Sequence, residues 1–209
     1  FGAKEYSLMR RYVVNASVLA AGISIAIAVV TALFCRQILI LIRTPENILD
    51  GAYLYLVIIF IGIPFTVLYN LAAGILRSLG DSKSPFLFLA ISTVINVIGD
   101  LVCILVFGMG VEGAAISTIV AQAISGICCV LYMKKRFAIL KLERQEEKLS
   151  SHRMKILLGM GVPMGLQFSI TAIGSVILQS AVNTLGSTVV AAFTAGMKVK
   201  QFTMAPYDA

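Results

Sequence analysis

The sequence predicts an all-α protein, a polytopic membrane helix bundle, and three observations carry that prediction. Of the 209 residues, 59% are hydrophobic and only 13% are charged, whereas soluble domains carry roughly 25% charged residues. Residues 12–35 and 51–76 contain no charged side chain, and each run is long enough to cross a hydrocarbon core about 30 Å thick as a helix. The basic residues lie mostly between such runs. We therefore expect lipid to surround most of the chain.

The first four spans follow from these runs in order. Residues 12–35 and 51–76 form the first and second spans, and Pro64 lies in the middle of the second. A proline there removes a backbone hydrogen bond and is expected to kink the helix. The third span covers about residues 85–107 and the fourth 113–133, with only the turn at 108–110 between them. We expect these two spans to form an antiparallel helical hairpin.

The remaining chain predicts two further spans. No charge occurs between residues 156 and 197, which is too long for one span. A polar and glycine-containing break at 183–187 divides it into a fifth span, about 155–182, and a sixth that begins near Thr188. The chain starts on Phe1 without an initiator methionine and stops within a partly apolar stretch, so we expect a fragment of a longer protein.

Lysine and arginine fall unequally on alternate polar segments, which predicts the orientation in the membrane. The segments predicted to lie outside carry only Arg36 and Arg43. Residues 134–155 are the longest polar segment and form a cytoplasmic linker, with residues 1–133 and 156–209 as separate helical regions. The basic residues on the predicted cytoplasmic side are Lys4, Arg10, Arg11, Arg77, Lys83, Lys134, Lys135, Arg136, Lys141, Arg144, Lys148, Arg153 and Lys155.

Asp100 is a lone carboxylate inside the apolar third span, and it indicates a site for a cation or a proton. An acid in hydrocarbon costs roughly 2.5–3.5 kcal/mol on insertion scales, so it persists where function uses it. Asn96 precedes it by four residues and shares its helix face. Counted from the turn, Thr118 on the fourth span lies at a similar depth. Its hydroxyl and the carbonyl of Ala114 complete a set of oxygen ligands suited to Na⁺.

Two structural interpretations compete with a coupling site. Asp100 can pair with a lysine or arginine from a helix outside the chain, or Asn96 and Thr118 can be interhelical hydrogen bonders only. Lys198 and its neighbour Lys200 also lie within a predicted span, where they either line a cavity or reach an aqueous vestibule. The other polar groups that either line a cavity or join helices are Tyr69, Asn70, Gln167 and Gln179.

Nothing in the sequence indicates an enzyme or a cofactor. There is no phosphate-binding glycine loop, nucleophile elbow or dinucleotide fingerprint. The four cysteines have no ligand-type spacing and are expected to be small buried hydrophobic residues. The net charge of +7 comes without an aromatic-rich basic face, so nucleic acid is not an expected partner. The expected partner is the lipid bilayer.

Several stretches resemble the multidrug and toxin extrusion family, MATE. The stretch GILRSLGDSKSPF at residues 74–86 is similar to the signature cytoplasmic loop of the family. The resemblance continues in INVIGD, GVEGAAISTIVAQ, GVPMGLQFS and LQSAVNTLGSTVVAAFTAG. It implies a two-lobe architecture of twelve helices, of which this truncated chain holds helices three to eight. Residues 1–133 then form the C-terminal part of the N-lobe, 134–155 the inter-lobe linker, and 156–209 the start of the C-lobe.

The resemblance also implies an activity. MATE proteins export drugs and other organic molecules in exchange for Na⁺ or H⁺, by rocking the lobes between inward-open and outward-open states. Gln167 suggests the DinF-like branch, whose N-lobe cation site matches Asn96, Asp100, Thr118 and the carbonyl of Ala114. The other acidic ligand of the family lies on helix one, outside this chain. We expect a monomer in a prokaryotic plasma membrane, a small organic substrate, an organic cation included, and Na⁺ or H⁺ as the coupling ion.

Two other functions remain open at this point. A flippase for lipid-linked oligosaccharides belongs to the same superfamily, and it would need a more cationic cavity than Lys198 and Lys200 provide. A non-transporting membrane subunit or a channel could share the same spans. Such a protein would not need Asn96, Asp100 and Thr118 to meet at one depth. Whether these three side chains face one another therefore discriminates between the hypotheses.

Overall fold

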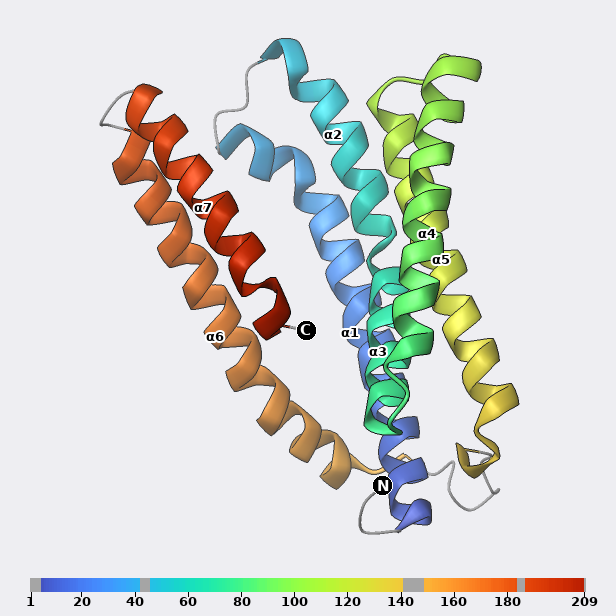
Figure 1. Ribbon diagram of the computed structural model, residues 1–209. Helices are drawn as coiled ribbons and strands as arrows, with labels where there is room; N and C mark the ends of the chain where they lie inside the picture. The colour runs from blue at the N-terminus through green and yellow to red at the C-terminus, as the bar shows by residue number, and fades with distance from the viewer. Residues whose placement is uncertain (1–4, 42–45, 141–148, 184–186, 209) are drawn as a thin grey trace. The chain divides into compact units, whose positions relative to one another are not determined.

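The computed structural model describes residues 5–41, 46–140, 149–183 and 187–208, and it confirms the all-α prediction (Figure 1). The described residues are almost entirely helical and contain no strand. They divide into two compact units, Phe1–Met154 and Lys155–Ala209. In chain order the helices are α1 (Tyr6–Leu41), α2 (Glu46–Ile61), α3 (Ile63–Ser78), α4 (Lys83–Leu101), a π-helical segment (Val102–Val106), α5 (Val111–Arg136), a short 3₁₀ helix (Ala138–Leu140), α6 (Ser151–Asn183) and α7 (Ser187–Asp208).

Four of the described helices are long and apolar enough to span a membrane, or five if the bent pair α2–α3 counts as one span. Large apolar side chains on them face outward, including Leu33, which is 69% exposed, and Phe86, which is 71% exposed. Such exposure suits lipid rather than water. The sequence predicted a sixth span, and a helix, α7, is present there. Over its described residues, which include Lys198 and Lys200, α7 is not among the helices apolar enough to span a membrane.

The predicted kink in the second span is confirmed as a bend of 41° between α2 and α3. The helix breaks at Gly62, and Pro64 lies in the first turn of α3. Proline is tolerated at this position because its missing N–H has no helical partner there. A Cβ on Gly62 would come within 2.5 Å of Ile119 Cγ1. The glycine thus lets α5 pack closely against the bend.

A tight turn connects α3 to α4 within the stretch GILRSLGDSKSPF. Gly80 has a φ of 88°, a left-handed conformation that favours glycine. The N–H of Asp81 donates to Leu76 O and that of Gly80 to Arg77 O, both at 3.0 Å, which is the Schellman pattern of a helix C-terminus. Asp81 then accepts the N–H of Ser84 at 3.0 Å and so caps the start of α4.

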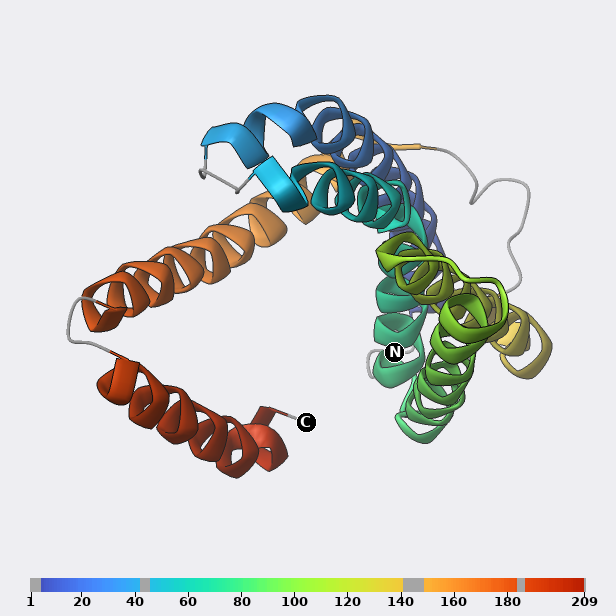
Figure 2. The ribbon, with the colours of Figure 1, turned by 90° about the horizontal axis from the view of Figure 1, so that it is seen from above.

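The antiparallel hairpin of the third and fourth spans is confirmed, and α4 and α5 lie side by side in both views (Figures 1 and 2). Its turn contains Gly108, which has a φ of 62°. The sequence did not predict the π-helical segment Val102–Val106 that ends the third span. There the N–H of Phe107 donates to Val102 O at 3.1 Å and that of Met109 to Cys103 O at 3.0 Å.

The first unit has its core where α3 and α5 meet. The buried cluster comprises Tyr69, Ala72, Ala73, Leu76 and Cys129. Phe88, Tyr132 and Phe137 pack against this cluster. The Tyr132 ring also makes edge-on contacts with Phe88 and Phe137, with ring centroids 5.6 Å and 6.4 Å apart. All four cysteines are free thiols.

Two hydrogen bonds join the start of α1 to the segment before α6. Asn15, which is fully buried, accepts the N–H of Ser150 at 2.8 Å and donates to Arg11 O at 2.8 Å. Arg10 Nη1 donates to Ile139 O at 3.1 Å. Helix α5 runs to Arg136 and α6 begins at Ser151, so the connection is shorter than the predicted linker of residues 134–155. Residues 141–148 lie outside the described part of the chain.

Candidate ion-coupling site

Asn96 and Asp100 lie one turn apart on the same face of α4. Asn96 Nδ2 donates to Asp100 Oδ1 at 3.3 Å, and both side chains are half-buried. No lysine or arginine pairs with Asp100 among the described residues, and this hydrogen bond is the one shown for its carboxylate. The alternative in which Asp100 pairs with a lysine or arginine from a helix outside this chain is not tested by these contacts.

Helix α5 supplies hydroxyl groups to the same place. Asn96 Nδ2 also lies 3.3 Å from Thr118 Oγ1 and 3.2 Å from Ser117 Oγ. Thr118 Oγ1 donates to the carbonyl of Ala114 at 2.9 Å, and Ser117 Oγ donates to the carbonyl of Asn96 at 2.9 Å. The structure thus brings together the four residues that the sequence singled out, Asn96, Asp100, Thr118 and Ala114.

Small residues let α4 and α5 approach at this depth. A Cβ on Gly99 would lie only 2.4 Å from Ser117 Oγ, so only glycine leaves room for the serine. Ser92, two turns away on α4, is buried and donates to Ala121 O at 2.6 Å. Close approach through small residues combined with interhelical hydrogen bonds is the usual way to pack helices in lipid.

Sequence reasoning missed Ser117 and the π-helical segment. Ser117 precedes Thr118 directly, and its position on α5 turns it toward α4, which spacing alone did not reveal. The π-helical segment begins two residues after Asp100. Such segments are rare and often occur at functional sites. A Cβ on Gly113 would lie 2.8 Å from Cys103 Cβ, so the start of α5 packs tightly against it.

The amide of Asn96 is shared among more acceptors than it can satisfy. Its Nδ2 carries two hydrogens but has three acceptors at 3.2–3.3 Å, on Asp100, Ser117 and Thr118. These distances are longer than the usual 2.9–3.0 Å for such bonds. The carboxylate, hydroxyl and carbonyl oxygens therefore keep unused lone pairs. Oxygen ligands of this kind bind hard cations, and the carboxylate alone can bind a proton.

The predicted cavity-lining residues do not gather at this site. Tyr69 is buried, and its hydroxyl donates to Pro85 O at 3.2 Å, which is the helix-packing interpretation. Asn70 is exposed on α3 of the first unit. Gln167 on α6 and Lys198 on α7 are exposed within the second unit. The side chain of Gln179 lies outside the described residues.

Comparison with known proteins identifies the kind of protein that holds this site. The MatE family model matches residues 1–102. The chain is 34% identical to the probable multidrug resistance protein YpnP of Bacillus subtilis (strain 168), over 98% of this chain and 46% of that protein. It is 25% identical to the multidrug export protein MepA of Staphylococcus haemolyticus, over 96% of this chain and 44% of that protein. It thus spans about half the length of these relatives.

Solved structures show the same fold. A crystal structure of MATE in complex with MaL6 superimposes with a TM-score of 0.90 at 22% identity, covering 98% of this chain and 46% of that one. An inward-facing MATE transporter of the MOP superfamily gives a TM-score of 0.81 over 98% of this chain and 47% of that one, also at 22% identity. The chain thus matches the MATE family in sequence over residues 1–102 and has the fold of solved MATE structures.

Proposed function

We propose that the protein containing this chain is a secondary antiporter that exports drugs or other small organic molecules in exchange for Na⁺ or H⁺. Asp100 carries the coupling ion, and Asn96, Thr118 and the carbonyl of Ala114 support it. The relatives named as multidrug resistance and multidrug export proteins support the substrate class. By the distribution of basic residues, the ends of α3, α4 and α5 near residues 77–83 and 134–136 face the cytoplasm of a prokaryotic cell.

The observation that carries this proposal is the meeting of Asn96, Asp100 and Thr118 at one depth between α4 and α5. Asn96 Nδ2 lies 3.3 Å from both Asp100 Oδ1 and Thr118 Oγ1. Within the described residues the Asp100 carboxylate has one long hydrogen bond in an apolar helix, a cost that a bound cation or proton would offset. A purely structural subunit would have no reason to retain it. The same geometry thus favours transport over the non-transporting alternative.

Cation binding would rearrange the side chains described here. An approaching Na⁺ needs oxygen atoms, so the amide of Asn96 would rotate to present Oδ1 in place of Nδ2. The hydrogen bonds from Asn96 to Ser117 and Thr118 would then break, which couples ion binding to the contact between α4 and α5. Protonation of Asp100 would instead turn its carboxyl group into a donor. Either event shifts a conformational equilibrium by the difference in ion affinity between the two states.

The test uses the full-length protein in proteoliposomes, with Na⁺ and pH gradients imposed separately and efflux of a fluorescent organic cation as the readout. Asp100→Asn should reduce gradient-driven efflux at least tenfold. Asp50→Asn is the matched control, because the Asp50 side chain is 88% exposed and pairs with Arg36 at 3.8 Å. It should transport like the wild type. Undiminished efflux by Asp100→Asn under both gradients would exclude Asp100 as the ion carrier.

A further inference from the structure

We infer that Ser117 is a positioning residue of the ion-coupling site. It holds the side-chain amide of Asn96 in an orientation that opposes Na⁺, and it thereby lowers the affinity of the site for that ion. This inference rests on the ion-coupling role proposed above for Asp100. It goes further because it assigns control of Na⁺ affinity to a residue outside the proposed ligand set of Asn96, Asp100, Ala114 and Thr118.

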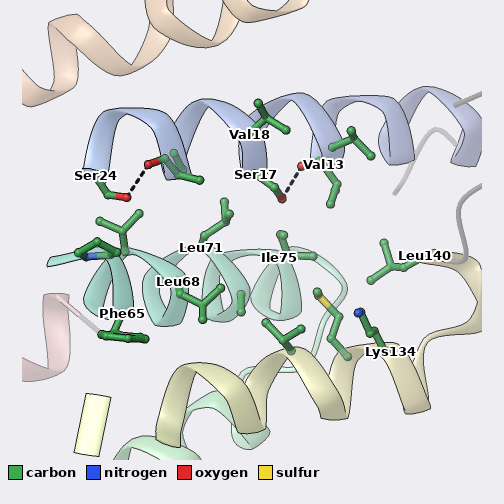
Figure 3. Close-up of a pocket in the computed structure, with 18 of the residues that line it drawn as sticks. Val13, Ser17, Val18, Ser24, Phe65, Leu68, Leu71, Ile75, Lys134 and Leu140 are labelled. Atoms are coloured by element: carbon green, nitrogen blue, oxygen red, sulfur yellow. Dashed lines mark hydrogen bonds between the residues drawn. The ribbon is translucent and has the colours of Figure 1, made fainter. Parts of the chain in front are cut away.

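The hydroxyl of Ser117 bonds to a neighbouring helix, which is not the usual arrangement for a helical serine. Such a serine commonly donates to a carbonyl one turn earlier in its own helix. Ser17 does so, since its Oγ donates to Val13 O at 2.8 Å where α1 lines an apolar cavity of about 930 Å³ (Figure 3). Ser117 Oγ instead donates from α5 to Asn96 O on α4, at 2.9 Å. The hydroxyl therefore acts on the partner helix.

Both hydrogen bonds of Ser117 go to Asn96. Ser117 Oγ donates its one hydrogen to Asn96 O and accepts from Asn96 Nδ2 at 3.2 Å. Because the hydrogen is used on the backbone carbonyl, the oxygen presents a lone pair to the amide and needs an N–H group there. Ser117 is 6% exposed, and only the missing Cβ of Gly99 leaves room for its hydroxyl. The hydroxyl thus holds the amide with its nitrogen toward α5.

That orientation places the amide nitrogen among the proposed Na⁺ ligands. Nδ2 lies 3.3 Å from both Asp100 Oδ1 and Thr118 Oγ1, where its N–H groups repel a cation. Na⁺ binding therefore requires the amide to rotate and present Oδ1. After this rotation Ser117 keeps only one of its two hydrogen bonds. It either continues to donate to Asn96 O with its lone pair against Oδ1, or it donates to Oδ1 and releases Asn96 O.

Thr118 does not carry the same cost. Its Oγ1 donates to Ala114 O at 2.9 Å, and the two residues are four apart, so both oxygens lie on one face of α5 and can bind the ion that replaces Nδ2. Ser117 points about 100° further around the helix axis, toward Gly99. It loses a bond when Na⁺ binds and gains no contact with the ion. Removing its hydroxyl should consequently favour Na⁺.

The experiment measures the binding of radioactive Na⁺ to the full-length protein in detergent by a scintillation proximity assay. Ser117→Ala should bind Na⁺ at least about fivefold more tightly than the wild type, the effect of roughly one net hydrogen bond. The matched control is Ser92→Ala, because Ser92 is also buried and donates across the same helix pair, to Ala121 O at 2.6 Å. It should change the affinity less than twofold.

Two results would overturn the inference directly. Equal gains in Ser117→Ala and Ser92→Ala would mean that any loosening of α4 against α5 favours Na⁺. Unchanged or weaker Na⁺ binding by Ser117→Ala would mean that the hydroxyl is neutral or is itself a ligand. If Ser117→Ala folds poorly, Ser117→Cys keeps the size of the side chain with a weaker hydrogen-bonding group. It should raise Na⁺ affinity at least twofold, and unchanged affinity would again contradict the inference.

Asp100→Asn separates this inference from the function on which it rests. Na⁺ binding that is lost in Asp100→Asn, but is no stronger in Ser117→Ala than in the wild type, would leave Asp100 as the ion carrier and overturn the role of Ser117 alone. Wild-type Na⁺ binding by Asp100→Asn would place the ion elsewhere and overturn both.

Discussion

Asp81, in the turn before α4, and Asp100, within α4, differ in how many hydrogen bonds their carboxylates accept. Asp81 accepts three hydrogen bonds, from Ser84 N at 3.0 Å, Ser84 Oγ at 2.7 Å and Tyr132 Oη at 3.0 Å. Among the described residues Asp100 accepts one, from Asn96 Nδ2 at 3.3 Å. The first carboxylate lies at the end of the helix bundle and fixes a turn. The second lies within an apolar span and keeps most of its capacity unused.

The difference teaches how to separate a structural acid from a functional one. Hydrogen-bond donors around Asp81 stabilise its charged form, so its pKa is lowered, chiefly by the backbone N–H of Ser84 and then by the Ser84 hydroxyl, with Tyr132 contributing. Most of the acceptor capacity of Asp81 is therefore used within the turn. Asp100 is placed where an unsatisfied charge is costly, as its proposed role as the ion carrier requires.

The largest difference in stability is expected between two variants that each remove one of these acids. Asp81→Ala should lower the free energy of unfolding by about 3 kcal/mol, because three hydrogen bonds at roughly 1 kcal/mol each are lost. Asp100→Asn should leave stability within about 0.5 kcal/mol of the wild type or raise it, since it removes an incompletely paired charge. Thermal unfolding of the full-length protein in detergent measures both. A larger loss for Asp100→Asn than for Asp81→Ala would reverse the assignment of roles.

A matched glycine pair tests the packing that supports Asp100. Gly99→Ala should destabilise by about 2 kcal/mol through overpacking, because the new Cβ would meet Ser117 Oγ and displace it from Asn96 O. Gly74→Ala on α3 has open space around the added Cβ and should stabilise by up to about 1 kcal/mol through helix propensity. Unfolding curves measure the stability of both variants. Of the two, only Gly99→Ala should also slow ion-coupled efflux. Equal stability for the two variants would contradict the close contact at Gly99.

A smaller effect is expected at the aromatic partner of Asp81. Tyr132→Phe removes one hydrogen bond to the carboxylate and keeps the ring contacts with Phe88 and Phe137. The loss should be about 1 kcal/mol in unfolding free energy. Efflux should stay at the wild-type rate. Wild-type stability together with reduced ion-coupled efflux in Tyr132→Phe would show that this turn also contributes to transport.

The pH dependence of stability should show the smallest effect. The pKa of Asp81 in the folded protein lies below its ordinary value of 3.8, so its stabilisation is complete above that value and is lost as pH falls through the folded pKa. Between pH 5 and 3 the wild type should lose more stability than Asp81→Asn, measured by unfolding at each pH. Parallel curves for the two proteins would mean that other carboxylates account for the acid sensitivity.

Most of the helical layout could be predicted from the sequence because span length and charge are local properties. Long apolar runs predicted α1, α4 and α5, and Pro64 predicted the bend. The hairpin followed from the short turn around Gly108. The helical period also placed Asn96 and Asp100 on one face and brought Thr118 to their depth. Their role in ion binding stays a prediction, because side-chain geometry does not measure affinity.

The remaining features depend on tertiary contacts that spacing does not encode. Ser117 meets Asn96 only because Gly99 leaves room for it, and neither residue alone indicates that contact. The pairing of Asn15 with Ser150 joins residues 135 positions apart. A side chain at the start of a span thus fixes the approach to α6. A regular helical period likewise gave no sign of the π-helical segment after Asp100, since apolar residues alone fill it.

That π-helical segment changes the phase of the third span. One residue more per turn shifts every later side chain by about 100° around the axis relative to a continuous α-helix. A relative that lost a single residue between Val102 and Val106 would keep enough apolar length for the bilayer. It would nevertheless turn Cys103 away from Gly113, where their close fit now aligns the turn end of the hairpin. Insertions and deletions in this short stretch therefore alter which faces meet and leave the number of crossings unchanged.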